Sequence, residues 1–365
     1  MRLKIIYSLL LVCLVIACSK ENIAEGETLQ VANLRTNAQC TPTDASVLTV
    51  TGGGNGYEDG NVRTAKFSIP ADVALNSKGD VVVADWGNHR IRKITQDGKV
   101  STIAGGLSGF QDGFGRNAQF LNPSSIAIDE KDNIYVVDRG NHAIRKIDKT
   151  GMVTTLAGNG TPGSNDGNGS QAQFYYPYGI TYSPDGSLYV TDEGSQRIRK
   201  VTLSGVVSTF AGSSLGYEDG YNAKFDFPRG ITADNNGNLL VVEWRGHRIR
   251  KIDPNGYVTT IAGSVEGYLD GSSNKARFKR PNGIAVDAAG NIYISEENNQ
   301  KLRVISTNGT VKTIAGSTSG YQNGVGAEAK FNYPRGIAID GTTMYIADMN
   351  NHRIRKAALA FDCVF

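Results

Sequence analysis

The sequence has few of the residues that most often build catalytic centres. Its 365 residues include four histidines, four cysteines and two tryptophans. No cysteine pair after the N-terminal leader has zinc spacing, and neither a phosphate-binding Walker loop nor a Gly-x-Ser-x-Gly turn occurs. All the histidines occupy one position of a repeated phrase: His89, His142, His247 and His352. No further histidine is left to ligate zinc or to act as a general base.

An excess of positive charge is missing as well. Removing Arg2 and Lys4 of the leader from the 38 Lys and Arg residues leaves 36, against 35 Asp and Glu residues. Domains that bind nucleic acids normally carry a basic surface, so no nucleic-acid partner is expected. Sustained helical periodicity is also absent between residues 46 and 365, which favours an all-β fold.

The chain does contain a ten-residue phrase that returns six times, as in Asp138-Arg-Gly-Asn-His-Ala-Ile-Arg-Lys-Ile147. Its leading acids recur every 51 to 54 residues, at Asp85, Asp138, Asp192, Glu243, Glu296 and Asp348. Such a period indicates a repeat architecture. Each period holds four β-favouring runs separated by turns, which is typical of a four-stranded antiparallel meander. Meanders stacked radially bury both faces, so the sequence predicts a six-bladed β-propeller over residues 46–365.

The last repeat ends before its fourth β-favouring run. The missing run stands near the other end of the chain, where Val47-Leu-Thr-Val-Thr51 aligns with Val100-Ser-Thr-Ile-Ala104. We therefore expect the N-terminal strand to complete the sixth blade and close the ring, which removes free sheet edges.

The segments Pro281-Asn-Gly-Ile-Ala-Val-Asp287, Asn133-Ile-Tyr-Val136 and Asn88-His-Arg-Ile-Arg-Lys93 resemble NHL repeats. The resemblance covers most of the chain and implies the propeller fold. It says less about function, because such propellers serve as binding platforms and as enzymes. The architecture is also similar to that of gluconolactonases, strictosidine-synthase-like proteins and the lyase half of peptide-amidating enzymes. A gluconolactonase-type metal site would need acids near the axis, for which Asp72 and Glu243 are the first candidates.

Residues that belong to every repeat are interpreted as structural. The leading acids are expected to accept hydrogen bonds from the N–H groups of the following turn, although a carboxylate ring around a metal is the alternative. The Arg-Ile-Arg-Lys runs are expected to pack their aliphatic stems between blades, with paired or solvated heads. The histidines are interpreted as blade-packing residues. The Asp-Gly pairs, such as Asp59-Gly60, are interpreted as turns rather than calcium loops.

Function is sought where the repeats differ. The residue after the proline of the innermost strand and the residue after the leading acid should emerge on one face of the ring. These positions supply the candidate binding face: Trp86, Arg139, Tyr178, Arg229, Trp244, Glu297 and Arg335. Exposed aromatic rings beside arginines suit sugars, peptides or carboxylated ligands. Random drift at exposed loop positions is the alternative.

The N-terminus resembles a bacterial lipoprotein leader. A basic start and a short apolar run (residues 1–17) precede Cys18, which would be lipidated and followed by a tether to residue 45. An ordinary signal peptide is the alternative. Cys40 and Cys363 flank the segments that close the ring and are expected to form a disulfide in an oxidising compartment, rather than remain as two free thiols.

Together these features predict a monomeric lipoprotein of the cell envelope, anchored in the outer membrane through its lipid alone. It would bind an envelope glycan, peptide or protein on one face, without a cofactor and without catalysis. The alternatives are a metal-dependent lyase or lactonase acting in the central channel, and a purely structural scaffold.

One mass-spectrometric measurement on the purified, unreduced protein checks both cysteine assignments. We expect a thioether-linked lipid on an N-terminal Cys18 and a peptide that joins Cys40 to Cys363. An unmodified N-terminus or a different cleavage point contradicts the first assignment, and two free thiols contradict the second.

Overall fold

A computed structural model describes residues 39–364. The leader, Cys18 and most of the predicted tether lie outside the described residues. Among the described residues, no helix has the length and apolar character needed to cross a bilayer.

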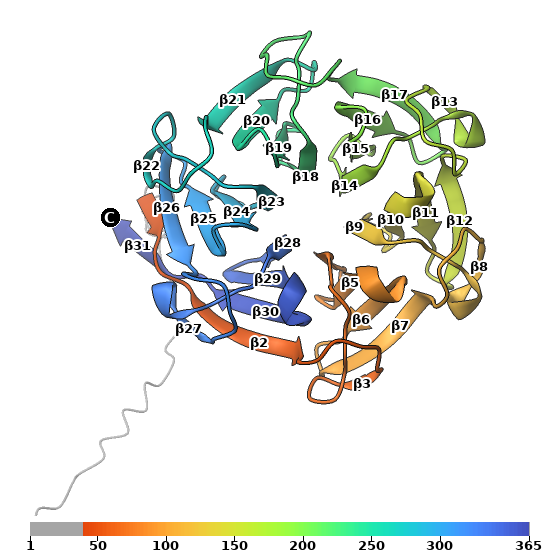
Figure 1. Ribbon diagram of the computed structural model, residues 1–365, viewed down its shortest axis with the longest axis horizontal. Coiled ribbons are helices and arrows are strands. Elements are labelled where there is room, and N and C mark those ends of the chain that lie inside the picture. Colours follow the sequence, from red (N-terminus) through yellow and green to blue (C-terminus); the bar gives the residue numbers. More distant parts are fainter. Residues whose placement is uncertain (1–38, 365) are drawn as a thin grey trace, which may run out of the picture. The chain divides into compact units, whose positions relative to one another are not determined.

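Six antiparallel sheets surround a central axis, which confirms the predicted all-β six-bladed propeller (Figure 1). In the first three blades the strands run from the axis outward as β4 (Asp72–Leu75), β5 (Val81–Asp85), β6 (Arg90–Ile94) and β7 (Lys99–Gly105); β9 (Pro123–Ile128), β10 (Ile134–Asp138), β11 (Ala143–Ile147) and β12 (Met152–Ala157); β14 (Pro177–Tyr182), β15 (Leu188–Asp192), β16 (Arg197–Val201) and β17 (Val206–Ala211).

The other three blades repeat this order. Their strands are β18 (Pro228–Ala233), β19 (Leu239–Glu243), β20 (Arg248–Ile252) and β21 (Val258–Gly263); β23 (Pro281–Val286), β24 (Ile292–Glu296), β25 (Lys301–Ile305) and β26 (Thr310–Ala315); β28 (Pro334–Asp340), β29 (Thr343–Asp348), β30 (Arg353–Ala358) and β2 (Ser46–Gly52). The only helices among the described residues are single 3-10 turns: η1 (Trp86–Asn88), η2 (Gly115–Asn117), η3 (Arg139–Asn141), η4 (Gly169–Gln171), η5 (Gly326–Glu328) and η6 (Met349–Asn351).

The prediction of four strands per blade needs one correction. Five blades carry a fifth, two-residue strand on the outside: β3 (Gly60–Asn61), β8 (Gly113–Phe114), β13 (Gly167–Asn168), β22 (Gly271–Ser272) and β27 (Gly324–Val325). In the fourth blade a single bridge between Gly220 and Val258 takes its place. Four of these strands begin at the glycine of an Asp-Gly pair and β27 begins at that of Asn323-Gly324, so the pairs add to the sheet edge as well as turning the chain.

The ring closes through the N-terminal strand, as predicted. Strand β2 pairs antiparallel with β30, with Val47 opposite Ala357 and Thr51 opposite Ile354 (Figure 1). The side chain of Val47 is fully buried in a core cluster shared by the fifth and sixth blades. Just outside this closure, β1 (Gln39–Pro42) pairs with β31 (Phe361–Val364). This pairing brings together the two segments that contain Cys40 and Cys363.

The apolar core is divided among the interfaces between neighbouring blades. At the first interface, Val82, Ala84 and Ile91 of the first blade pack against Phe120 and Val136 of the second. Alternating residues of each strand face opposite sides of the sheet, so every blade contributes to two such clusters. The stability of the ring is thus distributed over six small cores.

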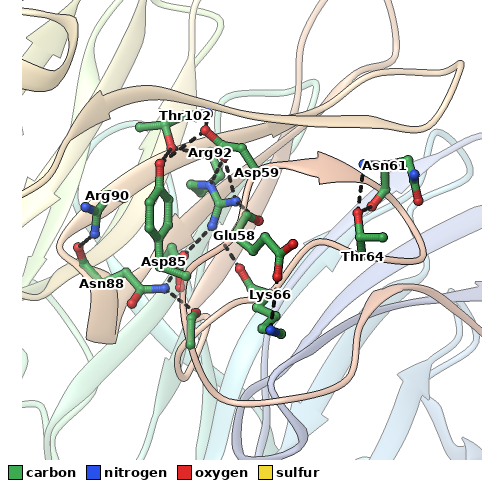
Figure 2. Close-up of polar contacts among 12 residues, drawn as sticks. Glu58, Asp59, Asn61, Thr64, Lys66, Asp85, Asn88, Arg90, Arg92 and Thr102 are labelled. Atoms are coloured by element: carbon green, nitrogen blue, oxygen red, sulfur yellow. Dashed lines mark hydrogen bonds and ion pairs between the residues drawn. The ribbon is translucent and has the colours of Figure 1, made fainter.

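Each blade also contains one fully buried arginine, shown for the first blade in Figure 2. Arg92 of β6 donates to the carboxylates of Asp85, at 2.8 Å, and Asp59, at 2.7 Å. It also donates to the backbone carbonyls of Glu58 and Lys66. The equivalent residues of the other blades are Arg145, Arg199, Arg250, Arg303 and Arg355. Each arginine therefore fastens its outer loop to the second strand.

This arrangement corrects the expected role of the leading acids. Asp85 does not accept a backbone N–H group of the turn that follows it. One of its oxygens accepts the N–H of Ser68, which lies 17 residues earlier, and the other accepts the side-chain amide of Asn88 in that turn and the guanidinium of Arg92. The acids are fully buried ion-pair partners, which rules out the alternative of an open carboxylate ring around a metal.

The histidines link neighbouring blades, in agreement with their predicted packing role. Nδ1 of His89 accepts the backbone N–H of Asn122 in the next blade, and Nδ1 of His352 accepts that of Ile69 across the closure. Where a repeat carries glutamine, as at Gln196, the amide oxygen accepts the equivalent N–H. Burial lowers the pKa of His89 and favours the neutral ring, which can accept at Nδ1.

Removing β2 should open the ring. Deleting residues 19–52 removes the strand that pairs with the outer edge of β30, whose other edge still pairs with β29. It also removes the buried Val47, which alone contributes about 1.5–3 kcal/mol. We expect a loss of several kcal/mol of unfolding free energy, or of cooperative unfolding, in calorimetry. A control that deletes residues 19–43 retains β2. Equal stability of the two deletions would show that β2 does not close the fold.

Candidate binding face at the mouth of the propeller

The predicted candidate face assembles around one opening of the central channel. Arg139, Glu297 and the two tryptophans follow second strands, whereas Tyr178, Arg229 and Arg335 stand near the start of innermost strands. Both positions lie at the same end of every blade, because the innermost and second strands are antiparallel neighbours. The structure therefore brings together residues up to 249 positions apart (Trp86 to Arg335).

Six residues, one from each blade, surround the opening, and we name them the mouth ring: Trp86, Arg139, Glu193, Arg229, Glu297 and Arg335. Glu193 pairs with Arg139 and Arg229, at 2.9 Å in each case. Glu297 pairs with Arg335 at 2.6 Å and lies 3.7 Å from Arg229. Acid and arginine thus alternate through five consecutive blades.

Trp86 completes the circuit in the first blade. The guanidinium of Arg139 lies 5.7 Å from the centre of the Trp86 ring, and that of Arg335 lies 5.8 Å from it. These distances are within the range of cation–π attraction. With three arginines and two glutamates, the mouth ring has one positive charge in excess.

Trp244 supports the mouth ring from the fourth blade. Its indole N–H donates to Glu297 at 2.7 Å. The guanidinium groups of Arg229 and Arg280 lie 3.8 Å and 4.5 Å from the centre of its ring. This indole is therefore already in contact with two cations of the protein itself.

Tyr178 and Asn282 bridge the opening beneath the mouth ring. The Asn282 amide donates to the Tyr178 hydroxyl at 2.9 Å and to Glu297 at 2.9 Å. Both residues also line the central cavity. They join the third blade to the fifth and form the floor of the face.

The exposure of these residues differs from the sequence expectation. Tyr178 is 5% exposed and Glu297 is 1% exposed, so neither presents a free side chain at the rim. Glu297 stands at the centre of the contacts with Arg335, Trp244 and Asn282. Its burial follows from its partners, because a carboxylate surrounded by donors loses little on leaving water.

Three members of the face were not among the candidate binding residues. Glu193 and Asn282 stand at the two repeat positions that were expected to emerge on this face, whereas Tyr176 stands at neither, and only the folded ring shows that they contact the others. The Arg139 guanidinium lies 5.0 Å from the Tyr176 ring, which is 42% exposed. A signal was present in that Glu193 follows a leading acid, as Trp86 and Glu297 do.

The channel below the floor is a cavity of about 310 Å³ lined by the innermost strands. Four blades have glycine two residues after the proline of the innermost strand. At this level, which we call the narrow level, neighbouring strands approach closely: a Cβ on Gly230 would lie 2.2 Å from the carbonyl oxygen of Asn282. The first two blades carry Asp72 and Ser125 instead. The hydroxyl of Ser125 donates to Asp72 at 2.6 Å, and the N–H groups of Ile126 and Val73 also donate to it.

Asp72 and Glu243, the two candidate metal ligands, do not come together. Glu243 is fully buried against Arg250, at 2.6 Å, and is not part of the channel lining. Among the described residues no cluster of three potential His, Cys, Asp or Glu ligands occurs. Asp72 faces the channel with no cation beside it, and burial raises its pKa to about 6 although its three hydrogen bonds lower it.

The repeat matches a known sequence family. The family described as NHL repeat matches residues 67–94, 120–147, 174–201, 225–252 and 278–305. Each matched segment begins at the phenylalanine packed beside the buried arginine and ends with the third strand. The part of the blade that matches the NHL repeat is therefore the part that holds the arginine and its leading acid.

The chain is similar to proteins of differing size and function. NHL repeat-containing protein 2 of Gallus gallus is 30% identical over 350 residues, which cover 82% of this chain and 47% of that protein. An auxiliary nutrient binding protein of Bacteroides thetaiotaomicron has the same fold, with a TM-score of 0.67, 18% identity and coverage of 88% and 77%. Virginiamycin B lyase of Staphylococcus aureus also shares the fold, with a TM-score of 0.54, 18% identity and coverage of 88% of this chain and 100% of that one. The chain spans 26% to 47% of the length of the first curated relatives.

The raised pKa of Asp72 predicts how the stability of the fold depends on pH. Its folded-state pKa of about 6 lies above the ordinary 3.8, so an ionised Asp72 destabilises the fold above pH 6. This cost disappears as the pH falls through 6 toward 4. Between pH 8 and pH 5 the wild type should therefore gain about 1 kcal/mol relative to Asp72→Asn. Urea unfolding of both proteins at pH 8 and at pH 5 measures this change. The contributions of all other titrating groups cancel when the two proteins are compared. Parallel curves for the two proteins would contradict the assigned pKa.

Proposed function

We propose that the protein is a non-catalytic binding propeller that takes its ligand at the mouth ring. The observation that carries the proposal is the net positive mouth ring, which places arginines and a partly exposed indole of Trp86 at the channel opening. Such a surface combines stacking area with charge-assisted hydrogen bonds. The residues common to all repeats pack the blades, whereas the residues of the mouth ring differ from blade to blade and lie together at one opening.

The proposed setting is the cell envelope. The leader-like residues 1–17 and Cys18 support lipid anchoring in an outer membrane, and the adjacent strands β1 and β31 support a Cys40–Cys363 disulfide in an oxidising compartment. The ligand is then an envelope glycan, a peptide or a protein partner. Similarity in fold to a protein named for auxiliary nutrient binding agrees with this class of function.

A metal-dependent lyase or lactonase is the second candidate function. The observation in its favour is Asp72, an acid without a cationic partner inside the channel of a fold that it shares with a lyase. Against it, the described residues place no second acid or histidine beside Asp72. A stoichiometric metal retained after mild purification, and lost in Asp72→Asn, would favour this candidate over a binding protein.

The two tryptophans should respond differently to truncation. In a thermal-shift screen of envelope glycans, peptides and small acids, Trp86→Ala should weaken the binding of an identified ligand by about 1–3 kcal/mol. It should leave the melting temperature of the free protein nearly unchanged, because Trp86 is partly exposed. Trp244→Ala should lower both affinity and stability, because it leaves Glu297 without its indole donor and uncovers two arginines.

The control is Arg245→Gln, which removes an exposed charge next to Trp244 but outside the mouth ring. Its affinity and melting temperature should match the wild type. An identified ligand whose affinity is unchanged in both tryptophan variants binds elsewhere on the protein, and the mouth ring is then a structural lid.

A further inference from the structure

The mouth ring is interrupted at one place. Between the second and sixth blades each acid lies between arginines, but Arg335 and Arg139 meet across the first blade with no acid between them. Only the indole of Trp86 lies there, at 5.7 and 5.8 Å from the two guanidinium groups. We name this place, formed by Arg139, Trp86 and Arg335, the seam.

Several hydrogen-bond donors at the seam have no acceptor among the described residues. Arg139 pairs with Glu193 through Nη2, while its Nε is buried and has no partner among the described residues. Arg335 uses Nε for Glu297, which leaves its terminal nitrogens outside that ion pair. The described hydrogen bonds likewise include none from the Trp86 indole N–H. The arginine side chains are 23% and 14% exposed, so both guanidinium groups are partly withdrawn from water.

The fourth blade offers no equivalent place. Two arginines lie within 4.5 Å of the Trp244 ring centre, and the N–H of Trp244 is already bonded to Glu297. Arg229 is shared between Glu193 and Glu297. The two tryptophans therefore differ in their contacts, although they occupy the same repeat position: the arginines at the seam lie further from the indole, at 5.7 and 5.8 Å.

We propose that the seam binds one carboxylate of a ligand whose attached ring lies on Trp86. The excess of one positive charge matches a single anionic group, and two guanidinium forks match the geometry of a carboxylate. Partial burial strengthens this attraction relative to an exposed pair. The exposed Tyr176 ring beside Arg139 extends the flat surface on one side. This inference rests on the proposed function and names the ligand chemistry: an acidic sugar unit or an aromatic acid.

Calorimetric titration of the full chain with two acid probes and their neutral counterparts tests the inference. Glucuronate is compared with glucose, and benzoate with benzyl alcohol. We expect at least one acid to bind about tenfold more tightly than its neutral partner, since a hydrogen bond to a charged group is roughly twice as strong as a neutral one. The acid that binds tells whether the ring is a sugar or an arene.

Variants of the seam locate the binding. Trp86→Ala, Arg139→Gln and Arg335→Gln should each weaken the acid about tenfold, whereas Arg245→Gln should not change it. Arg139→Lys retains the charge without the fork and should fall between wild type and Arg139→Gln. Melting curves verify that each variant is folded, and the milder Lys variant serves where Gln disrupts Glu193.

Four results overturn the inference: no binding of either acid, equal binding of acid and neutral partner, full binding in the seam variants, or equal loss in Arg245→Gln. The proposed function is judged separately, by the ligand found in the screen. If that ligand is lost in Trp244→Ala or Arg229→Gln but retained in the seam variants, the mouth ring binds it at another place and only the seam is rejected. If none of these variants affects it, both proposals fail.

Discussion

The buried arginine of each third strand is the contact on which the blade depends. It crosses from the strand to the outer loop and satisfies two carboxyl groups and two backbone carbonyls at once, as Arg92 does. A fully buried charge is tolerated only where it is paired and hydrogen-bonded. Displacement of the outer loop would therefore leave the arginine in the core without its partners. The sixth blade shows how much can vary: Asn323 takes the place of the outer aspartate beside Arg355, while the inner acid Asp348 remains.

The mouth of the propeller uses the same chemistry between blades instead of within them. Arginines and glutamates from five blades alternate there, and each glutamate holds two neighbours together. A circuit of this kind orders the loops over the channel before any ligand arrives, which lowers the entropy lost on binding. The same residues thus stabilise the opening and present its charge, and the indole in the first blade is the position where this circuit is not closed by an acid.

The inner surface of the channel is set by how closely the blades approach. Glycine at the narrow level lets neighbouring innermost strands lie almost in backbone contact, as between Gly230 and Asn282. The first blade departs from this rule and places a carboxyl group into the space that the glycines leave open, where Gly336 lies against Asp72. The raised pKa of Asp72 follows from this enclosure, because no cation accompanies it.

The sequence by itself determined the architecture. The period of the repeat gives the number of blades, and the truncated last copy identifies Val47–Thr51 as the closing strand, because both are properties of local β-patterning and of the order of the chain. It also located the variable face, since residues at equal repeat positions must emerge at the same end of the ring. Only the tertiary structure decided what those residues do. The pairing of Arg92 with Asp85 and Asp59, the burial of Glu297 and the contacts of Trp244 with two arginines depend on side chains that meet across loops and blades. Several of these contacts join residues that are distant in the sequence, such as Asp59 and Arg92, 33 positions apart, and Trp244 and Glu297, 53 positions apart. Their geometry follows from how the blades stack around the axis rather than from any local pattern.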